Sequence, residues 1–348
     1  MVYPNLTYYL IYTFSMRKFI FISILVLLSL GCRKEDGTTF EGPDLNDLYG
    51  PFSIMTELEL PDEFDFSTGG DVSFSLEISK QTNWVIEITG LSTGAKRIIQ
   101  GKERIISAEN ALWKGGADQF PSFGLESAVI SISFPDEEDA ETLYDTIEIL
   151  GLKADEGILI TSFESGMGDD WNVFNQTTTS GAISCNTGSA AKGQCSYSWN
   201  GLVPWDWAIG SVMVKPDSAG FGLPSNANNL FFNMAVKFIS NTGSNNSFIQ
   251  FWFDEDDNGD GVFDEASEDR FIYEYWYEDS SWQLVSINYA DLMYDENGEP
   301  KVLNGNSLPE PSKLIGINVF FLANKDNGER SIAEVDHLIF TTNQSYKP

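Results

Sequence analysis

The sequence predicts an all-β protein built from two sandwich domains. Short runs rich in β-branched and aromatic residues recur along the 348-residue chain, and several alternate between apolar and polar residues as half-buried strands do. The 30 glycines and 13 prolines are spread along the chain, which is typical of turns between short strands. A chain of 348 residues is long enough for two domains, so we expect two sandwiches rather than one.

The first domain is expected over residues 51–152 as an immunoglobulin-like sandwich. Strand-like patterns occupy residues 71–79, 83–89, 128–134 and 146–150. Short strands separated by turns are typical of this architecture. Trp84 lies in an early strand and is expected in the core, whereas Trp113 stands beside Lys114 and two glycines and is expected at the surface. No motif with chemistry is present here, so we interpret the domain as a spacer.

A new pattern follows the linker at residues 151–157. Its features are a strand ending in Phe163-Glu164 before a Gly/Asp turn and Trp171, an alternating strand at 230–238, the segment WQLVSINYADL at 282–292, and a closing strand at 332–340. Together, and in this order, they resemble jelly-roll, galactose-binding-like carbohydrate-binding modules. The resemblance implies a jelly-roll sandwich over residues 157–343 that binds a glycan.

The N-terminus has the pattern of an export signal. Met16 precedes two basic residues, and residues 19–30 form an uncharged, mostly apolar run that is too short for a comfortable membrane span. The following Gly31-Cys32 resembles a bacterial lipobox, which implies cleavage before Cys32 and lipid on that cysteine. We therefore expect a signal peptide over residues 1–32 with its true start at Met16, and a flexible tether over residues 33–50.

Residues 33–36, Arg-Lys-Glu-Asp, resemble the short export tag of surface lipoproteins of the Bacteroidetes. The layout of anchor, spacer and C-terminal binding domain also resembles the surface glycan-binding lipoproteins of that group. The resemblance implies an outer-membrane lipoprotein that faces outward and has a glycan and an outer-membrane glycan importer as partners. A periplasm-facing anchor is the alternative.

Aromatic residues are the candidate sugar contacts. Indole and phenol rings can stack on the C–H faces of sugars, while nearby amides and carboxylates bind hydroxyl groups. Alternation along residues 230–238 and 248–253 suggests one sheet face that carries Asn233, Lys237, Gln250 and Trp252. Trp205 and Trp207 form a candidate loop platform after a proline. In residues 271–277, either the face of Tyr273 and Tyr275 or the face of Trp276 is outward.

Calcium is the expected structural cofactor, because an acidic loop fits the D-x-[DN]-x-[DN]-G pattern. In one register the ligands are Asp256, Asn258, Asp260, the Val262 carbonyl and Asp264. In a second register the loop starts at Asp254 and supplies Glu265; a solvated acidic hairpin tip is the alternative to both. The resemblance to jelly-roll modules implies a second calcium, shared by Glu164 and Asp336.

Composition and motifs exclude some function classes. A net charge of −32 repels phosphate backbones, so nucleic-acid binding is not expected. The single histidine, without a G-x-S-x-G motif, argues against a Ser-His-Asp enzyme. The E-x-D-x-x-E motif of jelly-roll glycosidases is missing. We therefore expect a binding protein and no enzyme; an adhesive or structural surface protein without a sugar ligand is the main alternative, ahead of a polysaccharide lyase or hydrolase.

The chain has three cysteines. With Cys32 lipidated, Cys185 and Cys195 remain, ten residues apart in a Gly/Ser-rich segment. A disulfide between them accounts for all three cysteines in an exported protein, and two free thiols are the alternative.

Overall fold

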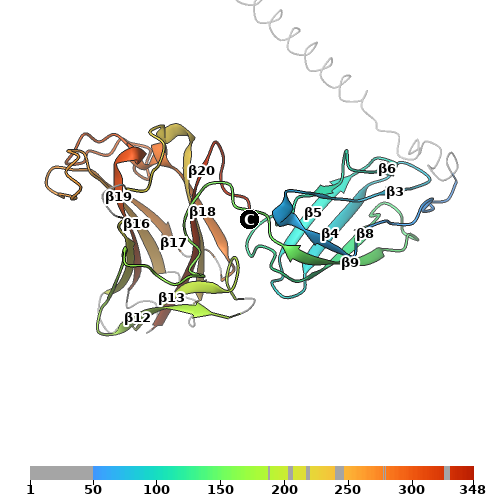
Figure 1. The fold of residues 1–348 in the computed structure, drawn as a ribbon, viewed down its shortest axis with the longest axis horizontal. Coiled ribbons are helices and arrows are strands. Elements are labelled where there is room, and N and C mark those ends of the chain that lie inside the picture. Colours follow the sequence, from blue (N-terminus) through green and yellow to red (C-terminus); the bar gives the residue numbers. More distant parts are fainter. Residues whose placement is uncertain are drawn as a thin grey trace, which may run out of the picture. The chain divides into compact units, whose positions relative to one another are not determined.

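The computed structural model describes residues 50–186, 189–202, 207–216, 220–239, 247–276, 278, 280–324 and 330–348. These residues form β-strands and short 3-10 turns, so the all-β fold class is confirmed (Figure 1). No helix in this part of the chain is long and apolar enough to cross a membrane. The predicted signal peptide, the lipobox with Cys32 and the tether to residue 49 lie outside the described residues.

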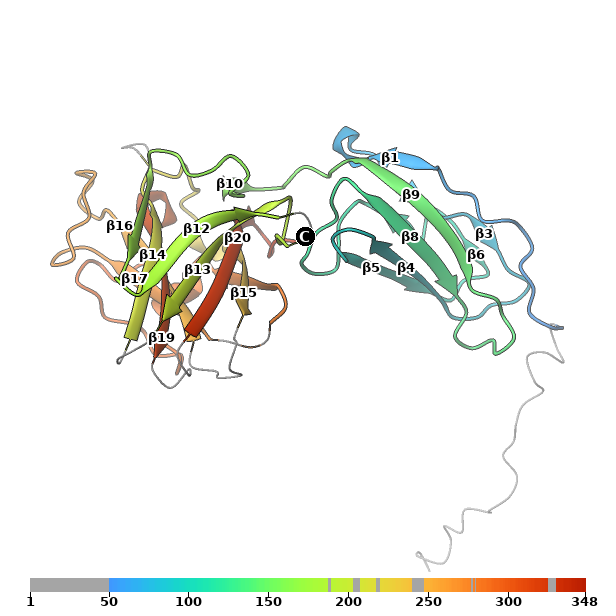
Figure 2. The same cartoon turned by 90° about the horizontal axis from the view of Figure 1, so that it is seen from below.

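The described residues belong almost wholly to one compact unit, Phe52–Pro348, which contains two large hydrophobic cores. The first core lies in an N-terminal sandwich whose main sheet has the order β1-β9-β8-β4-β5 (Figure 2). Two small sheets, β2-β7 and β3-β6, accompany it. The strands are β1 Glu63–Asp65, β2 Val72–Ser73, β3 Leu76–Glu77, β4 Trp84–Gly90, β5 Lys96–Gly101, β6 Ile105–Ile106, β7 Leu112–Trp113, β8 Ser127–Ser133 and β9 Leu143–Gly151.

Alternation builds this first core. Every second residue of β4 is buried, beginning with Trp84, which is fully buried as predicted. Trp113 is also fully buried, so its predicted surface position is wrong. Its ring packs edge-on against Phe66 and Phe123 at 4.7 and 4.9 Å, and its Nε1 donates to the Gly116 carbonyl. The neighbouring Lys-Gly-Gly run indicates a turn, whereas pairing of β7 with β2 directs the ring inward.

The second core lies between the two sheets of a C-terminal sandwich. One sheet has the order β12-β13-β20-β15-β18 with β10 paired to β20, and the other has the order β11-β14-β19-β16-β17 (Figure 1). The strands are β10 Ile158–Thr161, β11 Trp171–Asn175, β12 Thr179–Cys185, β13 Cys195–Leu202, β14 Trp207–Val214, β15 Leu230–Ile239, β16 Ser247–Glu255, β17 Arg270–Trp276, β18 Gln283–Asn288, β19 Leu314–Asn324 and β20 Arg330–Thr342.

Aromatic side chains join the two sheets of the C-terminal sandwich. Phe232 of β15 lies 5.2 Å from Phe251 and 5.0 Å from Phe253 of β16, measured between ring centroids. All three rings are fully buried. Two sheets that each carry an apolar inner face stack in this way because the period-two alternation places all large apolar residues on one side. The outer face of each sheet is then available for other roles.

The 3-10 turns are η1 Phe66–Thr68, η2 Ala227–Asn229, η3 Tyr289–Met293 and η4 Pro311–Lys313. A disulfide joins Cys185 to Cys195, the pair predicted from the cysteine count, where β12 and β13 meet across the sheet. The backbone between these cysteines supplies N–H donors to two acidic side chains described below.

Candidate functional site

The strongest candidate surface is the outer face of the sheet β11-β14-β19-β16-β17. Ile249, Phe251 and Phe253 of β16 point into the core, so Phe248, Gln250 and Trp252 point outward. The strand register continues this face onto both neighbouring strands. Its members from β19 are Asn318, Phe320 and Leu322, and those from β17 are Ile272, Glu274 and Trp276. We call these nine side chains the outer face.

Two aromatic pairs dominate the outer face. Phe248 and Trp276 stack with their ring centroids 4.3 Å apart and an interplanar angle of 18°. Trp252 and Phe320 lie 4.2 Å apart at 39°. Trp276 is 48% exposed, so much of its ring is accessible to a ligand. Phe248 and Trp252 are four residues apart on one strand, which separates the two pairs by about 13 Å.

A row of hydrogen-bonded polar groups lies between the two aromatic pairs. The Gln250 Nε2 donates to Glu274 Oε1 at 2.6 Å, and the Trp252 Nε1 donates to Gln250 Oε1 at 3.0 Å. These bonds hold the amide and the carboxylate in fixed orientations. Glu274 is exposed, and its carboxylate can accept hydrogen bonds from hydroxyl groups of a ligand.

Arg270 closes one end of the outer face. Its guanidinium makes a two-pronged ion pair with Asp254, with contacts of 2.6 and 3.1 Å. The same guanidinium lies 4.5 Å from the centroid of the Trp252 ring and 4.4 Å from that of Phe263. Burial raises the pKa of Asp254, although the Arg270 partner opposes the shift. Arg270 therefore has two roles: its guanidinium packs against the Trp252 ring, and it supplies the countercharge for the buried Asp254 carboxylate.

The prediction that Asn233 shares a face with Gln250 and Trp252 is wrong. Asn233 lies on β15, in the opposite sheet, and is fully buried. Its Nδ2 donates to Thr341 Oγ1 at 2.9 Å, and its Oδ1 accepts the backbone N–H of Tyr346 at 3.0 Å. Lys237, also on β15, pairs with Glu334 of that sheet. Consecutive strands β15 and β16 belong to different sheets, so a shared polarity pattern does not place them on one face.

The structure also decides between the two faces of β17. Tyr273 pairs with Phe251 and Tyr275 with Ile249, so both tyrosines lie on the core side of the sheet. Tyr275 is half-buried and stacks on Phe238 at 6.2 Å, while Tyr273 is 37% exposed at this edge strand. Neither belongs to the outer face, which instead contains Trp276.

Phe248, Trp276 and Phe320 are outer-face residues that the sequence did not assign as sugar contacts. Alternation within residues 314–324 places Asn318, Phe320 and Leu322 opposite the buried set Ile317, Val319 and Phe321. This alternation identifies Phe320 as an outer-face residue once the buried side of the strand is known. Trp205 and the side chain of Trp207 lie outside the described residues, although Trp207 begins β14.

The acidic loop after β16 wraps its own backbone around Asp256. The carboxylate of Asp256 accepts the N–H groups of Gly259, Asp260 and Gly261 at 2.7 to 3.2 Å. Burial would raise the pKa of Asp256, but these donors outweigh burial and hold the pKa below its usual value. Asp256 also shares a hydrogen bond with the buried Glu268. Three backbone N–H groups and the carboxyl group of Glu268 therefore surround the Asp256 carboxylate.

The other predicted ligands of this loop turn toward neighbouring N–H groups. Asn258 Oδ1 accepts from Asp260, Asp260 Oδ1 accepts from Val262, and Asp264 Oδ1 accepts from Ala266, at 2.8 to 3.0 Å. In the described part of the chain, no three His, Cys, Asp or Glu side chains are grouped to hold a metal ion. Asp256 and Glu268 are the two carboxyl groups that the loop brings into contact.

Glu164 and Asp336 are brought near the segment between the two disulfide cysteines. Glu164 Oε1 accepts the N–H groups of Gln194 and Cys195, both at 2.7 Å. Asp336 is fully buried, and its Oδ2 accepts the N–H groups of Ala191 and Lys192 at 3.0 Å. Burial raises the pKa of Asp336 well above its usual value, and the charge of Glu164 raises it further. A cation between these two carboxylates would relieve that repulsion.

The solved structures that match this chain include carbohydrate-binding modules. One, from work on the promiscuous specificity of modules of the β-sandwich superfamily, has a TM-score of 0.37 and 10% identity, over 84% of this chain and 98% of that chain. SGBP-B from a xyloglucan utilization locus in Bacteroides uniformis has a TM-score of 0.35 and 12% identity, over 84% and 73%. The CBM22-1 xylan-binding domain of Paenibacillus barcinonensis Xyn10C has a TM-score of 0.30 and 13% identity, over 55% and 99%.

No protein-family model matches the chain, and no curated protein matches it.

Proposed function

We propose that the C-terminal sandwich is a non-catalytic module that binds an oligosaccharide or polysaccharide on its outer face. The observation that carries the proposal is the pair of aromatic stacks with a hydrogen-bonded amide and carboxylate between them. Sugar rings present C–H patches that stack on aromatic faces, and their hydroxyls bond to fixed polar groups. Trp276 and Glu274 supply these two kinds of contact side by side on one strand.

The spacing of the aromatic pairs supports a chain ligand rather than a single sugar. Phe248 and Trp252 are separated by about 13 Å along β16, which is longer than one sugar ring. A ligand that reaches both pairs must therefore contain several sugar units. We expect affinity to rise with chain length until both pairs are occupied.

The experiment is Trp276→Ala, with binding to polysaccharides measured by calorimetry and affinity electrophoresis. Aromatic anchors dominate many interfaces, so we expect a loss of about tenfold or more, which corresponds to about 1.4 kcal/mol. Loss of the stack on Phe248, which is 5% exposed, should lower the free energy of unfolding by about 0.5–1.5 kcal/mol, and the variant should remain folded. Tyr144→Ala is the matched control, because Tyr144 is a 73% exposed aromatic residue of the other sandwich.

Binding of a neutral glycan should change little with salt, because it gains nothing from the charge of −32. Equal affinity in Trp276→Ala and Tyr144→Ala would refute the outer face as the site. A glycan array without any hit in the presence of calcium would instead favour an adhesive or structural protein without a sugar ligand.

Calcium is proposed as a structural cofactor at two places. Asp256 would hold the ion in the acidic loop, and the Glu268 contact supports a position near that carboxylate. Glu164 and Asp336 would hold the second ion next to the disulfide hairpin. Bound calcium supplies positive charge that offsets carboxylate repulsion. The ion in the acidic loop would stabilise the end of β16 in the outer-face sheet, and the second ion would stabilise β10 and β20 in the opposite sheet.

The site of action is proposed to be the cell surface, with the protein held in the outer membrane by lipid on Cys32 and partnered with a glycan importer. The apolar run followed by Gly31-Cys32 supports this proposal. Cys32→Ala should release the protein from the membrane fraction or leave an unprocessed precursor. Normal fractionation and unchanged mass would refute the anchor, and protease treatment of intact cells would separate an outward from a periplasmic position.

A further inference from the structure

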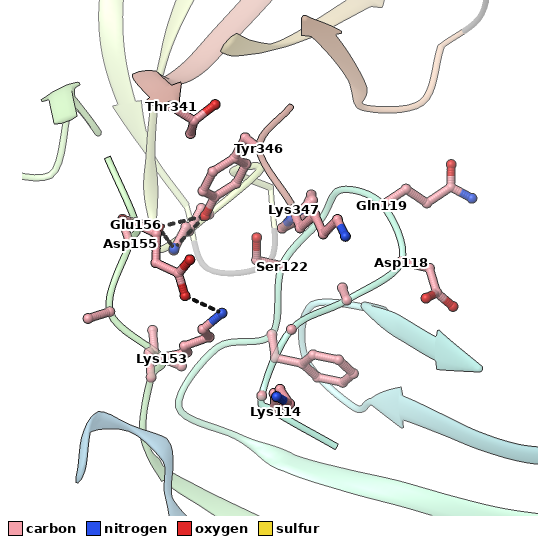
Figure 3. Close-up of a pocket in the computed structure, with 18 of the residues that line it drawn as sticks. Lys114, Asp118, Gln119, Ser122, Lys153, Asp155, Glu156, Thr341, Tyr346 and Lys347 are labelled. Atoms are coloured by element: carbon pink, nitrogen blue, oxygen red, sulfur yellow. Dashed lines mark hydrogen bonds and ion pairs between the residues drawn. The ribbon is translucent and has the colours of Figure 1, made fainter. Parts of the chain in front are cut away.

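The structure contains a cavity of about 710 Å³, whose lining residues are drawn in Figure 3. Its lining comes from three chain segments: residues 112–119 with 122–123, residues 152–157, and residues 341–342 with 344–348. Arg97, Lys192 and Leu284 complete the lining. A volume of this size is in the range that holds small organic ligands. None of the residues that line this cavity belongs to the outer face.

The cavity wall is rich in basic residues although the protein is strongly acidic. The chain has 20 basic and 52 acidic residues, yet five basic and three acidic side chains line this wall. Each of the three acidic side chains is already paired: Asp118 with Arg97, Asp155 with Lys192, and Glu156 with Lys153. Lys114 and Lys347 make no ion pair within the described residues, so two cationic side chains remain for a ligand.

The side of the wall formed by Asp155 is rigidly organised. The Tyr346 hydroxyl donates to Asp155 Oδ1 at 2.6 Å, and the Lys192 ammonium donates to the Tyr346 hydroxyl at 2.8 Å (Figure 3). Burial would raise the pKa of Asp155, but His337 and Lys192 outweigh it and hold the pKa well below its usual range. Asp155 is therefore a carboxylate whose charge is balanced within the wall by His337 and Lys192.

Ser122 is an independent sign of a ligand. Its side chain is 5% exposed, and its Oγ has no hydrogen-bond partner in the described part of the protein. The backbone N–H of Ser122 donates to the Ala191 carbonyl at 2.8 Å, which fixes the residue in the wall. A buried hydroxyl without a partner costs free energy, and a ligand that bonds to it removes that cost.

We propose that this cavity binds an anionic sugar unit, which carries a carboxylate or a sulfate group. Lys114 and Lys347 would contact the anionic group, and Ser122 would bond to a hydroxyl of the ring. Further hydroxyl and amide groups of the wall come from Gln119 and Thr342. Leu112 and Leu284 supply apolar surface for the C–H groups. The combination fits a compact, polyhydroxylated anion better than an apolar acid.

The test is calorimetric titration of the full chain with galacturonic acid, galactose 6-sulfate, galactose and inorganic sulfate. We expect one or both anionic sugars to bind and galactose to bind at least about tenfold more weakly. The double variant Lys114→Gln/Lys347→Gln should lose about tenfold in affinity for the anionic sugar, and Ser122→Ala about threefold. Binding should weaken strongly as salt approaches about 1 M, where the screening length is about 3 Å.

Lys102→Gln is the control, because it removes one charge from an exposed lysine that does not line the cavity. Equal binding of galactose and the anionic sugars, or unchanged affinity in the double variant, would overturn the proposal. Inorganic sulfate that binds as tightly as the anionic sugars would overturn the sugar assignment. Thermal unfolding of each variant verifies folding, and Trp276→Ala should leave this binding intact, which separates the cavity from the outer face.

Discussion

Removal of the Arg270 charge should reveal how the outer face is stabilised. Asp254 is 6% exposed, and Arg270 is its two-pronged partner. Arg270→Gln leaves this buried carboxylate without its countercharge, which typically costs about 3–5 kcal/mol. Loss of the cation–π contacts with Trp252 and Phe263 adds about 0.5–1 kcal/mol each at accessible sites. Together these contributions give an expected loss of about 4–7 kcal/mol in the free energy of unfolding.

A second substitution separates the two contributions. Asp254→Asn in the Arg270→Gln background removes the unpaired charge, so it should restore about 3 kcal/mol or more of the free energy of unfolding. The cation–π loss should remain, because neither substitution replaces the guanidinium over Trp252. Both variants should also bind glycan more weakly, since Trp252 loses the group that holds its ring.

The assay is urea unfolding of the natural protein and the two variants, followed by tryptophan fluorescence and fitted for the transition of the C-terminal sandwich. The reasoning is refuted if Arg270→Gln costs less than about 1 kcal/mol, a value typical of exposed ion pairs. It is also refuted if Asp254→Asn does not rescue Arg270→Gln, because the cost would then not come from the buried charge.

Three further outcomes are expected. Replacing Cys185 and Cys195 by serine should lower the free energy of unfolding by about 2.7 kcal/mol, the loop-entropy value for a separation of 10 residues. Burial would raise the pKa of Glu126, but backbone N–H and hydroxyl donors lower it overall. The ionised Glu126 carboxylate therefore stabilises the folded protein above the unfolded pKa near 4.5, and this stabilisation is lost as the pH falls through the folded pKa. Glu126→Gln should thus cost about 2 kcal/mol at neutral pH and little in acid. EDTA should lower the melting temperature, since calcium at a hundredfold excess over Kd adds about 2.7 kcal/mol, and Asp260→Ala should reduce this shift.

Each outcome has a measurement that can contradict it. Two alkylatable thiols in the protein isolated from its native cells would reject the disulfide. A Glu126→Gln variant that loses stability equally at neutral and acid pH would show that its carboxylate charge is unimportant. Identical melting curves with and without chelator would count against both calcium positions.

The local pattern of the chain determines the fold class and much of the core. Alternation alone predicts that Ile249, Phe251 and Phe253 share one side of a strand, and all three are fully buried. It also places Gln250 and Trp252 on the opposite side, where the structure has them. Period-two alternation is a property of the extended backbone, so it can be identified without any knowledge of neighbouring strands.

The tertiary structure decides which strands share a sheet and which side of an ambiguous strand is buried. Asn233 and Gln250 have similar patterns, yet β15 and β16 lie in opposite sheets and only Gln250 belongs to the outer face. In β17 both faces contain aromatic residues, and pairing with β16 alone places Trp276 outward and Tyr275 on the core side. Long-range pairing sets these choices, because alternation fixes only the relative faces within one strand. The cavity near Ser122 likewise depends on segments far apart in the chain, so no local pattern could predict it.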